Sequence, residues 1–263
     1  MKVLYVTTFN KKLYDQSGKN LIDSFLKHIS CGEMLVCYED IEFCNLNPER
    51  ILEYNMEKDQ YMCNWINNNK HNIPEMYGGI ADSNHHIVKQ FESKKGQYWA
   101  NHRASRYFRK IVALNYAINK FSNNYEFIFF VDSDCIFKKN ITLEKIESEL
   151  FGNNESMIYY WSNYRMEIGR GPETGLTGYC KKNNGFKFIK HICDCFESQD
   201  FLRFEYWDDG YVIGRLIKEN NDSYNFKDLV GDSKERTTRV MEIKTNPLFG
   251  YIHHFKNRHQ TSV

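Results

Sequence analysis

The sequence lacks the features of membrane, secreted and zinc-binding proteins. No apolar run reaches the roughly 20 residues of a membrane-spanning helix, and the run Val3–Val6 near the N-terminus is too short for a secretory signal. The 8 cysteines show no paired CxxC spacing, and Cys193-Asp194-Cys195 lacks the second ligand pair that a metal site needs. We therefore expect a soluble cytoplasmic protein with reduced thiols and no membrane anchor.

The sequence also lacks an excess of charge of either sign. The 35 Lys+Arg residues against 34 Asp+Glu residues give a formal net charge of +1. This balance excludes a surface that is positively charged throughout and binds polyanions everywhere. Any contact with nucleic acid is then expected to be local. The length of 263 residues and the absence of internal repeats are compatible with a single domain, and no obligate protein partner is indicated.

The N-terminal part reads as a β-α-β unit. Val3–Phe9 is apolar and β-branched, as a buried strand is, and the helical spacing of apolar residues over Leu21–Ile29 predicts a helix. Met34–Tyr38 predicts the next strand. This order is typical of a parallel, doubly wound α/β sheet. Pro48–Trp65 then predicts a helix.

The clearest strand of the sequence lies after a long amphipathic helix. An apolar stripe over Tyr107–Phe121 predicts that helix, and Phe127–Val131 is continuously hydrophobic, as a central parallel strand covered on both faces is. The strand ends at Asp132-Ser133-Asp134. Ligands of open α/β sheets bind beyond the carboxyl ends of such strands, so these carboxylates stand where chemistry is expected.

Further elements are predicted downstream. They are a strand at Met157–Trp161, helices at Phe186–Phe196 and Gly210–Lys218, and a last short element at Leu248–His254.

Asp132 and Asp134 form a candidate metal site. Two aspartates separated by one residue can face a common hard cation, Mg²⁺ or Mn²⁺; the alternative is that one of them caps a turn. His254 and Lys256 lie in a cationic segment near the C-terminus, where an imidazole would complete the cation site and an ammonium would neutralise a phosphate. The alternative for this segment is a solvated basic tail.

A second acidic pair follows an aromatic residue. Trp207 offers a face for a sugar ring, and Asp208 or Asp209 can accept a proton from an attacking hydroxyl. The alternative is an acidic first turn favoured by the helix dipole, and we expect one of the two aspartates to serve as a helix cap.

The glycine-rich segment Gly169–Gly178 separates the two acidic pairs. It lacks the GxxxxGK[ST] pattern of a phosphate-binding loop, so we interpret it as a mobile loop that lines a sugar or acceptor pocket. The alternative is an ordinary loop.

The order of these features resembles that of DxD-containing glycosyltransferases with the GT-A fold, closest to bacterial and phage members. The resemblance covers residues 1–259 and includes Arg109-Lys110-Ile111, Asp132-Ser133-Asp134, Glu173-Thr174-Gly175, Trp207-Asp208-Asp209 and His254-Phe255-Lys256. It implies a single GT-A (Rossmann-like) domain over residues 1–263, with a mostly parallel central sheet flanked by helices. Residues 1–140 would bind the nucleotide sugar and residues 141–263 would bind the acceptor and carry the C-terminal motif.

The resemblance also implies roles for individual residues and a nucleotide-sugar donor, most simply a UDP-sugar. The implied metal ligands are Asp132, Asp134 and His254; the donor contacts are Thr7, Arg103, Lys110, Asp132, Ser133 and Lys256; the substrate contacts are Glu173, Thr174, Gly175 and Trp207; the catalytic candidates are Asp208 and Asp209. The chain departs from the pattern at Asn257, where related motifs often have a glycine.

Two other classes of protein remain open. Haloacid-dehalogenase-like phosphatases also place a DxD at the end of a buried strand, and Gly231-Asp232 resembles their later acidic motif. In this chain, however, no second aspartate follows at the expected short spacing, and the DxD of that family usually lies on the first strand. A non-enzymatic carbohydrate- or DNA-binding module is the other alternative, although it would not require both the aspartates and the terminal His-x-Lys.

The acceptor is the least determined feature. Arg103, Arg106, Arg109 and Lys110, interleaved with Tyr107 and Phe108, are compatible with a track for a polyanion or with a solvated helix face. Hydroxymethylated pyrimidines in viral DNA are one candidate acceptor, and the base would then have to leave the stack. A cell-surface glycan or a lipid-linked sugar is the other.

Overall fold

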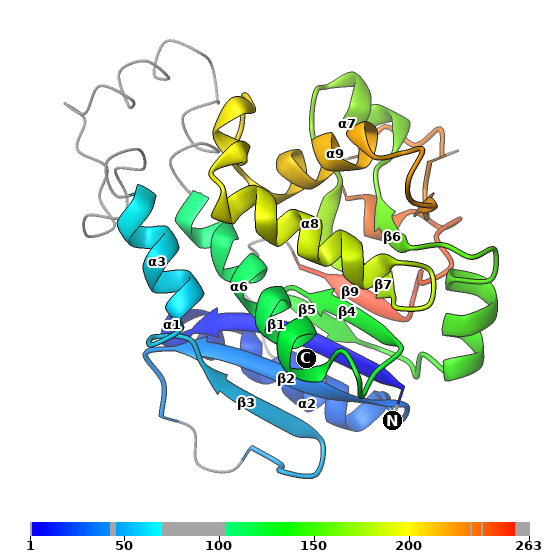
Figure 1. Cartoon of the computed structure of the whole chain (residues 1–263). Helices are drawn as coiled ribbons and strands as arrows, with labels where there is room; N and C mark the ends of the chain where they lie inside the picture. The colour runs from blue at the N-terminus through cyan, green and yellow to red at the C-terminus, as the bar shows by residue number, and fades with distance from the viewer. Residues whose placement is uncertain (1, 43–45, 70–103, 232, 238, 256–263) are drawn as a thin grey trace.

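The chain forms an α/β structure with a central sheet between two layers of helices (Figure 1). The computed structural model describes residues 2–42, 46–69, 104–231, 233–237 and 239–255. In it, α3, α6 and α8 cover one face of the sheet and α2 covers the other. The predicted fold class, a mostly parallel sheet flanked by helices, is confirmed.

The strands are β1 (Val3–Asn10), β2 (Gly32–Glu39), β3 (Ile51–Asn55), β4 (Phe127–Val131), β5 (Cys135–Phe137), β6 (Met157–Tyr160), β7 (Glu173–Cys180), β8 (Phe226–Asp228) and β9 (Ile252–His254). The α-helices are α1 (Lys11–Leu13), α2 (Lys19–His28), α3 (Gln60–Asn69), α6 (Ala104–Phe121), α7 (Asn163–Glu167), α8 (Gly185–Glu197) and α9 (Asp209–Glu219). Short π or 3₁₀ helices are η1 (Tyr14–Gly18), η3 (Lys145–Leu150), η4 (Asp200–Arg203) and η5 (Val240–Glu242).

The main sheet has 7 strands in the order β3-β2-β1-β4-β7-β6-β8. The strands β3, β2, β1 and β4 pair in parallel, while β7 pairs antiparallel with both β4 and β6. β6 and β8 are again parallel. Among the described strands of this sheet, β7 alone is reversed, so its first residues lie at the edge where β1 and β4 end.

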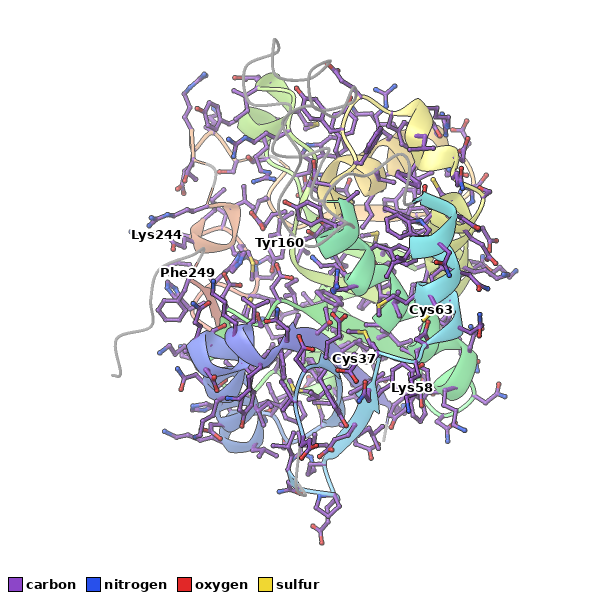
Figure 2. The ribbon with its side chains drawn as sticks, turned by 90° about the vertical axis from the view of Figure 1, so that its left-hand side faces the viewer. Cys37, Lys58, Cys63, Tyr160, Lys244 and Phe249 are labelled. Atoms are coloured by element: carbon purple, nitrogen blue, oxygen red, sulfur yellow. The ribbon has the colours of Figure 1, made fainter. Side chains whose placement is uncertain are left out.

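The hydrophobic core has two parts, one on each face of the sheet. Alternate side chains of a strand point to opposite faces, and accordingly Leu4 and Val6 of β1 pack with α6 and α8, whereas Val3 and Tyr5 pack with α2. All five residues of β4 are buried, which agrees with its continuous hydrophobicity. Figure 2 shows side chains filling the space between the ribbons, with Phe249, which is 45% exposed, at the periphery.

The β-α-β opening and the long helix before β4 are confirmed, but two predicted segments differ. The predicted helix Pro48–Trp65 contains strand β3 and only the first part of α3. β3 forms because its residues pair with β2, and tertiary pairing of this kind overrides local preference.

The predicted mobile loop Gly169–Gly178 is mostly the strand β7, whose eight residues are all buried. Its glycines fit close neighbours rather than a flexible loop: a Cβ on Gly178 would lie 2.7 Å from the ring of Phe129. The prediction of a mobile loop was therefore wrong for the residues from Glu173 onward.

The described cysteines form no disulfide, and most of them are buried in the core. Burial raises the pKa of Cys195 to about 12 and raises that of Cys193 as well, so both stay protonated thiols. The expected core position is confirmed for Cys193 and Cys195, while their reduced state stays a prediction and Cys44 lies outside the described residues.

In the described part of the chain, no helix combines the length and the apolar character needed to cross a membrane.

Candidate active site

A polar cavity of about 310 Å³ lies at the edge of the sheet where β1 and β4 end. β1 contributes Thr8, and Asp132 and Ser133 follow β4 directly. Because β7 is reversed, its first residues reach the same edge, and the start of α9 closes the cavity on a further side. The lining residues are Thr8, Leu13, Tyr107, Lys110, Asp132, Ser133, Arg165, Pro172, Glu173, Thr174, Asp208, Asp209 and Gly210.

Asp132, Asp134 and His254 lie together although they are far apart in the sequence. β9 pairs antiparallel with β5, and this register places His254 opposite Cys135. The Nε2 atom of His254 lies 3.0 Å from Oδ1 of Asp134 and 4.0 Å from Oδ2 of Asp132. The structure thus brings together the three side chains that the sequence indicates as metal ligands.

Glu173 adds a third carboxylate to this group. Its Oε1 lies 3.7 Å from Nδ1 of His254, and its Oε2 accepts a hydrogen bond of 3.3 Å from the Arg165 guanidinium. Candidate ligand atoms of Asp132, Glu173 and His254 all lie within 4.8 Å of one another. Glu173 therefore faces both the cavity and the candidate metal ligands.

The crowding of carboxylates shifts the acid–base equilibria of the group. Burial acts to lower the pKa of His254, but its hydrogen bond with Asp134 and the charges of the nearby carboxylates outweigh that effect and raise it. Burial raises the pKa of Asp132 to about 6, against the opposing influence of Lys110. The group concentrates negative charge that a bound cation would offset.

The donor atoms of this group suit a hard divalent cation. Carboxylate oxygens are the ligands that Mg²⁺ and Mn²⁺ prefer, and an imidazole nitrogen is compatible with Mn²⁺. The thiol of Cys135 also lies close to Asp134 and His254, but burial raises its pKa well above the ordinary range. A thiol is also a soft ligand, so Cys135 suits a hard cation less well than the carboxylates do.

Lys110 of α6 connects the two acidic pairs. Its ammonium lies 3.1 Å from Oδ1 of Asp132 and 2.5 Å from Oδ2 of Asp209, and it donates hydrogen bonds of 3.1 Å to the backbone oxygen and hydroxyl of Thr174. Lys110 is only 7% exposed. Burial acts to lower its pKa, but the two carboxylates outweigh this effect and raise it, so the ammonium stays charged.

Asp208 and Asp209, the second acidic pair, contact different parts of the structure. Asp208 is the N-cap of α9, and its Oδ1 accepts a hydrogen bond of 3.0 Å from the backbone N–H of Tyr211. Asp209 is 4% exposed, and its Oδ2 accepts a hydrogen bond of 2.6 Å from the Thr174 hydroxyl in addition to its contact with Lys110. Burial, with a further contribution from Asp209, raises the pKa of Asp208 to about 6.

Trp207 does not offer its ring to a ligand. It is 6% exposed, its indole N–H donates to the backbone oxygen of Phe204 at 3.1 Å, and its ring meets that of Phe201 edge to face. Trp207 is also not among the residues that line the cavity. The expected sugar platform is corrected: this aromatic side chain belongs to the core.

The remaining predicted contacts fall in different places. Ser133 and Thr174 line the cavity, but Thr7 is fully buried within β1, and its neighbour Thr8 lines the cavity instead. Gly175 lies within β7, where its backbone oxygen accepts a hydrogen bond of 2.8 Å from the backbone N–H of Asp132. Arg103 and Lys256 lie outside the described residues.

The expected basic track on α6 is largely absent from the described residues. Phe108 is buried in the core, Arg109 forms an ion pair with Glu39, and Lys110 is buried between carboxylates. Arg103 and the side chain of Arg106 lie outside the described part of the chain. The expectation of a solvated basic face is therefore wrong for Lys110.

Arg165 and Leu13 line the cavity but gave no signal in the sequence, whereas the other lining residues belong to segments that the sequence analysis singled out. Arg165 lies in α7, which is five residues long and too short for a hydrophobic period, and its Nε donates to the backbone oxygen of Gly171 at 2.9 Å. Leu13, Tyr107 and Pro172 also line the cavity. Only the reversed direction of β7 and the fold of the segment before it bring Arg165 and Pro172 to this edge.

Solved structures with a similar arrangement include glycosyltransferases. The apo form of mouse xyloside xylosyltransferase 1 is 11% identical, with a TM-score of 0.46 over 87% of this chain and 85% of that chain. Two structures of the glycosyltransferase GlyE from Streptococcus pneumoniae TIGR4, one of them the apo form, are 12% and 14% identical, each with a TM-score of 0.44. These matches cover 87% and 86% of this chain but 45% of the GlyE chains, so this chain spans less than half of their length. The sequence matches no protein-family model and no curated protein sequence.

Proposed function

We propose that this chain is a metal-dependent glycosyltransferase that moves a sugar from a nucleotide-sugar donor to an acceptor hydroxyl. The observation that carries the proposal is the pairing of two features at one cavity. Asp132, Asp134 and His254 converge at the carboxyl end of a buried strand, and Asp132 lines the same cavity as the acidic pair Asp208 and Asp209. One group fits a cation and the other fits a hydroxyl acceptor, which is the division that sugar transfer requires.

The cation side would hold Mn²⁺ or Mg²⁺ through Asp132, Asp134 and His254. When bound, the cation neutralises the charge of a diphosphate leaving group, which stabilises the transition state by several kcal/mol in general. We infer that Ser133, which lines the cavity, contacts the donor, and that Thr174, which also lines it, contacts the substrate. Arg103 and Lys256 remain proposed donor contacts, and a UDP-sugar is the proposed donor.

On the acceptor side we propose Asp208 as the general base if the reaction inverts the anomeric centre. A base needs a carboxylate oxygen open to the cavity and a pKa near the working pH. Asp208 lines the cavity, and burial raises its pKa to about 6. Asp209 fits the role less well because Lys110 and Thr174 both hold its Oδ2. We propose that Asp209 positions the site through Lys110.

A neutral glycan or a lipid-linked sugar fits the described residues better as acceptor than hydroxymethylated DNA. The described part of α6 presents no basic and aromatic track, since Phe108 and Lys110 are buried and Arg109 is paired with Glu39. The cavity itself carries four carboxylates (Asp132, Glu173, Asp208 and Asp209) and two cations (Lys110 and Arg165) among its lining residues, which disfavours a phosphate backbone close to it.

The test is a screen of UDP- and GDP-sugars for nucleoside diphosphate release with Mn²⁺ and with excess EDTA. We expect release from one class of donor with the metal and none with EDTA. Adding hydroxymethylated DNA, glycans or lipid-linked sugars then identifies the acceptor by product mass. Full activity in EDTA would contradict the metal assignment. Turnover of generic phosphate esters without any nucleotide-sugar activity would favour the phosphatase instead.

A further inference from the structure

The imidazole ring of His254 occupies the space that a side chain at position 175 would need. A Cβ built on Gly175 would lie 2.6 Å from Cε1 and 2.7 Å from Nδ1 of His254, and real Cβ atoms do not approach other atoms so closely. The backbone of Gly175 cannot yield easily, because its oxygen accepts the hydrogen bond from the N–H of Asp132. Any side chain at this position must therefore displace the imidazole.

Glu173 lies two residues before Gly175 on the same strand, so both positions face the same side of β7. Nδ1 of His254 is buried and makes no hydrogen bond, and the carboxylate of Glu173 stands 3.7 Å from it. Arg165, itself buried, holds the other oxygen of that carboxylate. The separation of 3.7 Å is only slightly longer than a hydrogen bond.

We propose that Glu173 and Gly175 form a seat on β7 that orients His254 as a metal ligand. Gly175 leaves room for the ring, and the carboxylate of Glu173 accepts a hydrogen bond from Nδ1–H. The lone pair of Nε2 then points to the side of Asp132 and Asp134. Both are positioning residues rather than catalytic ones. This inference rests on the proposed function, because it takes His254 to be a ligand of the cation.

The arrangement follows a general property of metal sites. A ligating histidine usually donates its second ring N–H to a carboxylate or a carbonyl, which fixes both the tautomer and the orientation of the ring. Loss of such a partner typically lowers metal affinity by about 10–100-fold. Here Glu173, the hydrogen-bond partner, and Gly175, which leaves space for the ring, both lie in β7. One backbone segment therefore determines both the tautomer and the orientation of His254.

The test measures Mn²⁺ affinity by calorimetry, without donor or acceptor, in the full chain. We expect His254→Ala and Gly175→Ala to weaken Mn²⁺ binding by about 10–100-fold, and Glu173→Gln to weaken it by about 10-fold. Gly178→Ala is the matched control, since this glycine is in the same strand but meets Phe129 instead of His254. It should leave Mn²⁺ affinity unchanged whatever its effect on stability.

Glu173→Gln also has a spectroscopic readout that a purely structural role would not change. In the wild type with diamagnetic Mg²⁺ bound, ¹⁵N NMR should show His254 protonated at Nδ1 and unprotonated at Nε2. The variant should shift the Nδ1–H resonance. Weakened metal binding with an unchanged Nδ1–H resonance would make Glu173 a direct ligand and overturn its positioning role.

If Gly175→Ala folds poorly, a double-mutant cycle with His254→Ala still tests the role of Gly175. Thermal unfolding in EDTA measures the stability of each variant. Gly175→Ala should destabilise the wild type much more than it destabilises His254→Ala, where the imidazole is gone. Equal losses in both backgrounds would contradict the contact with His254.

The outcomes separate this inference from the proposed function. If the wild type binds no Mn²⁺ or Mg²⁺, the proposed metal dependence fails. If the wild type binds the cation and His254→Ala weakens binding while Gly175→Ala and Glu173→Gln do not, the seat fails and the proposed function stands.

Discussion

The two acidic pairs at the cavity are built in different ways. Asp132 and Asp134 follow a fully buried strand, and with one residue between them both reach His254. Asp208 and Asp209 are adjacent at the start of a helix, and their side chains diverge: one caps α9 and the other is buried against Lys110. Here the two aspartates at i and i+2 can share one cation, whereas the two at i and i+1 make separate contacts.

This difference bears on how such pairs are interpreted in a sequence. The expectation that one aspartate of the second pair caps the helix is confirmed for Asp208, and a chemical role for either aspartate stays a prediction. Asp208 both caps the helix and faces the cavity, while Asp209 is the more enclosed of the two. Capping uses one oxygen of a carboxylate and leaves the second oxygen for other contacts.

The largest expected effect comes from the strand pair. Asp134→Ala should lower transfer by about 10⁴-fold or more and should abolish measurable Mn²⁺ binding, because the diphosphate would face uncompensated charge. Transfer rate and Mn²⁺ calorimetry measure the two effects. Asp23→Ala, at an exposed ion pair with Lys19, is the control and should change neither. Retained Mn²⁺ binding in Asp134→Ala would remove this residue from the ligand set.

The link between the pairs should matter most for stability. Lys110→Met should lower the free energy of unfolding by about 3–5 kcal/mol, because Asp209 would be left buried without its cation. Urea unfolding checks this, with Lys19→Met as the exposed control that should leave the free energy of unfolding nearly unchanged. Lys110→Met combined with Asp209→Asn should recover part of the loss. Additive losses in the double variant would show that the two residues are not coupled.

Asp208→Asn should separate chemistry from helix capping. Asn accepts the cap hydrogen bond about as well as Asp, so α9 should persist while the base is lost. We expect transfer to fall by about 10²–10⁴-fold with donor affinity nearly unchanged, measured as rate and calorimetric affinity. Equal and mild rate effects in Asp208→Asn and Asp209→Asn would remove both residues from the catalytic set.

The smallest effect concerns the cap itself. Asp208→Ala should lose about 0.5–2 kcal/mol of stability relative to Asp208→Asn, because the backbone N–H of Tyr211 loses its acceptor. Urea unfolding of both variants gives the difference. Equal stability of the two would mean that the cap contributes nothing measurable.

The sequence was sufficient where one local pattern determined one element. Phe127–Val131 is uniformly apolar and is a strand buried on both faces, and Asp132 and Asp134 follow it as expected. The spacing over Tyr107–Phe121 likewise predicted most of α6. In these segments, burial on the sheet and the intrinsic preference of the residues agree.

The sequence was insufficient where the neighbours determine the role of a residue. The glycines of β7 are typical of a loop, yet they lie in a buried strand because Phe129 and His254 need the space that a side chain would fill. Trp207 carries no local sign of whether its ring packs in the core or faces a ligand. Arg165 reaches the cavity only through the fold of the segment before β7. Such contacts join residues distant in the chain, and periodicity does not encode them.

The pairing of β9 with β5 sets the moment at which His254 can join Asp132 and Asp134 during synthesis. The chain leaves the ribosome from its N-terminus at about 5–20 residues per second, so every strand of the main sheet is made before His254. At that rate, Asp132 and Asp134 are made several seconds before the imidazole of His254. The last strand of the described residues, which pairs with β5 outside the main sheet, therefore determines when the protein first acquires its full set of proposed metal ligands.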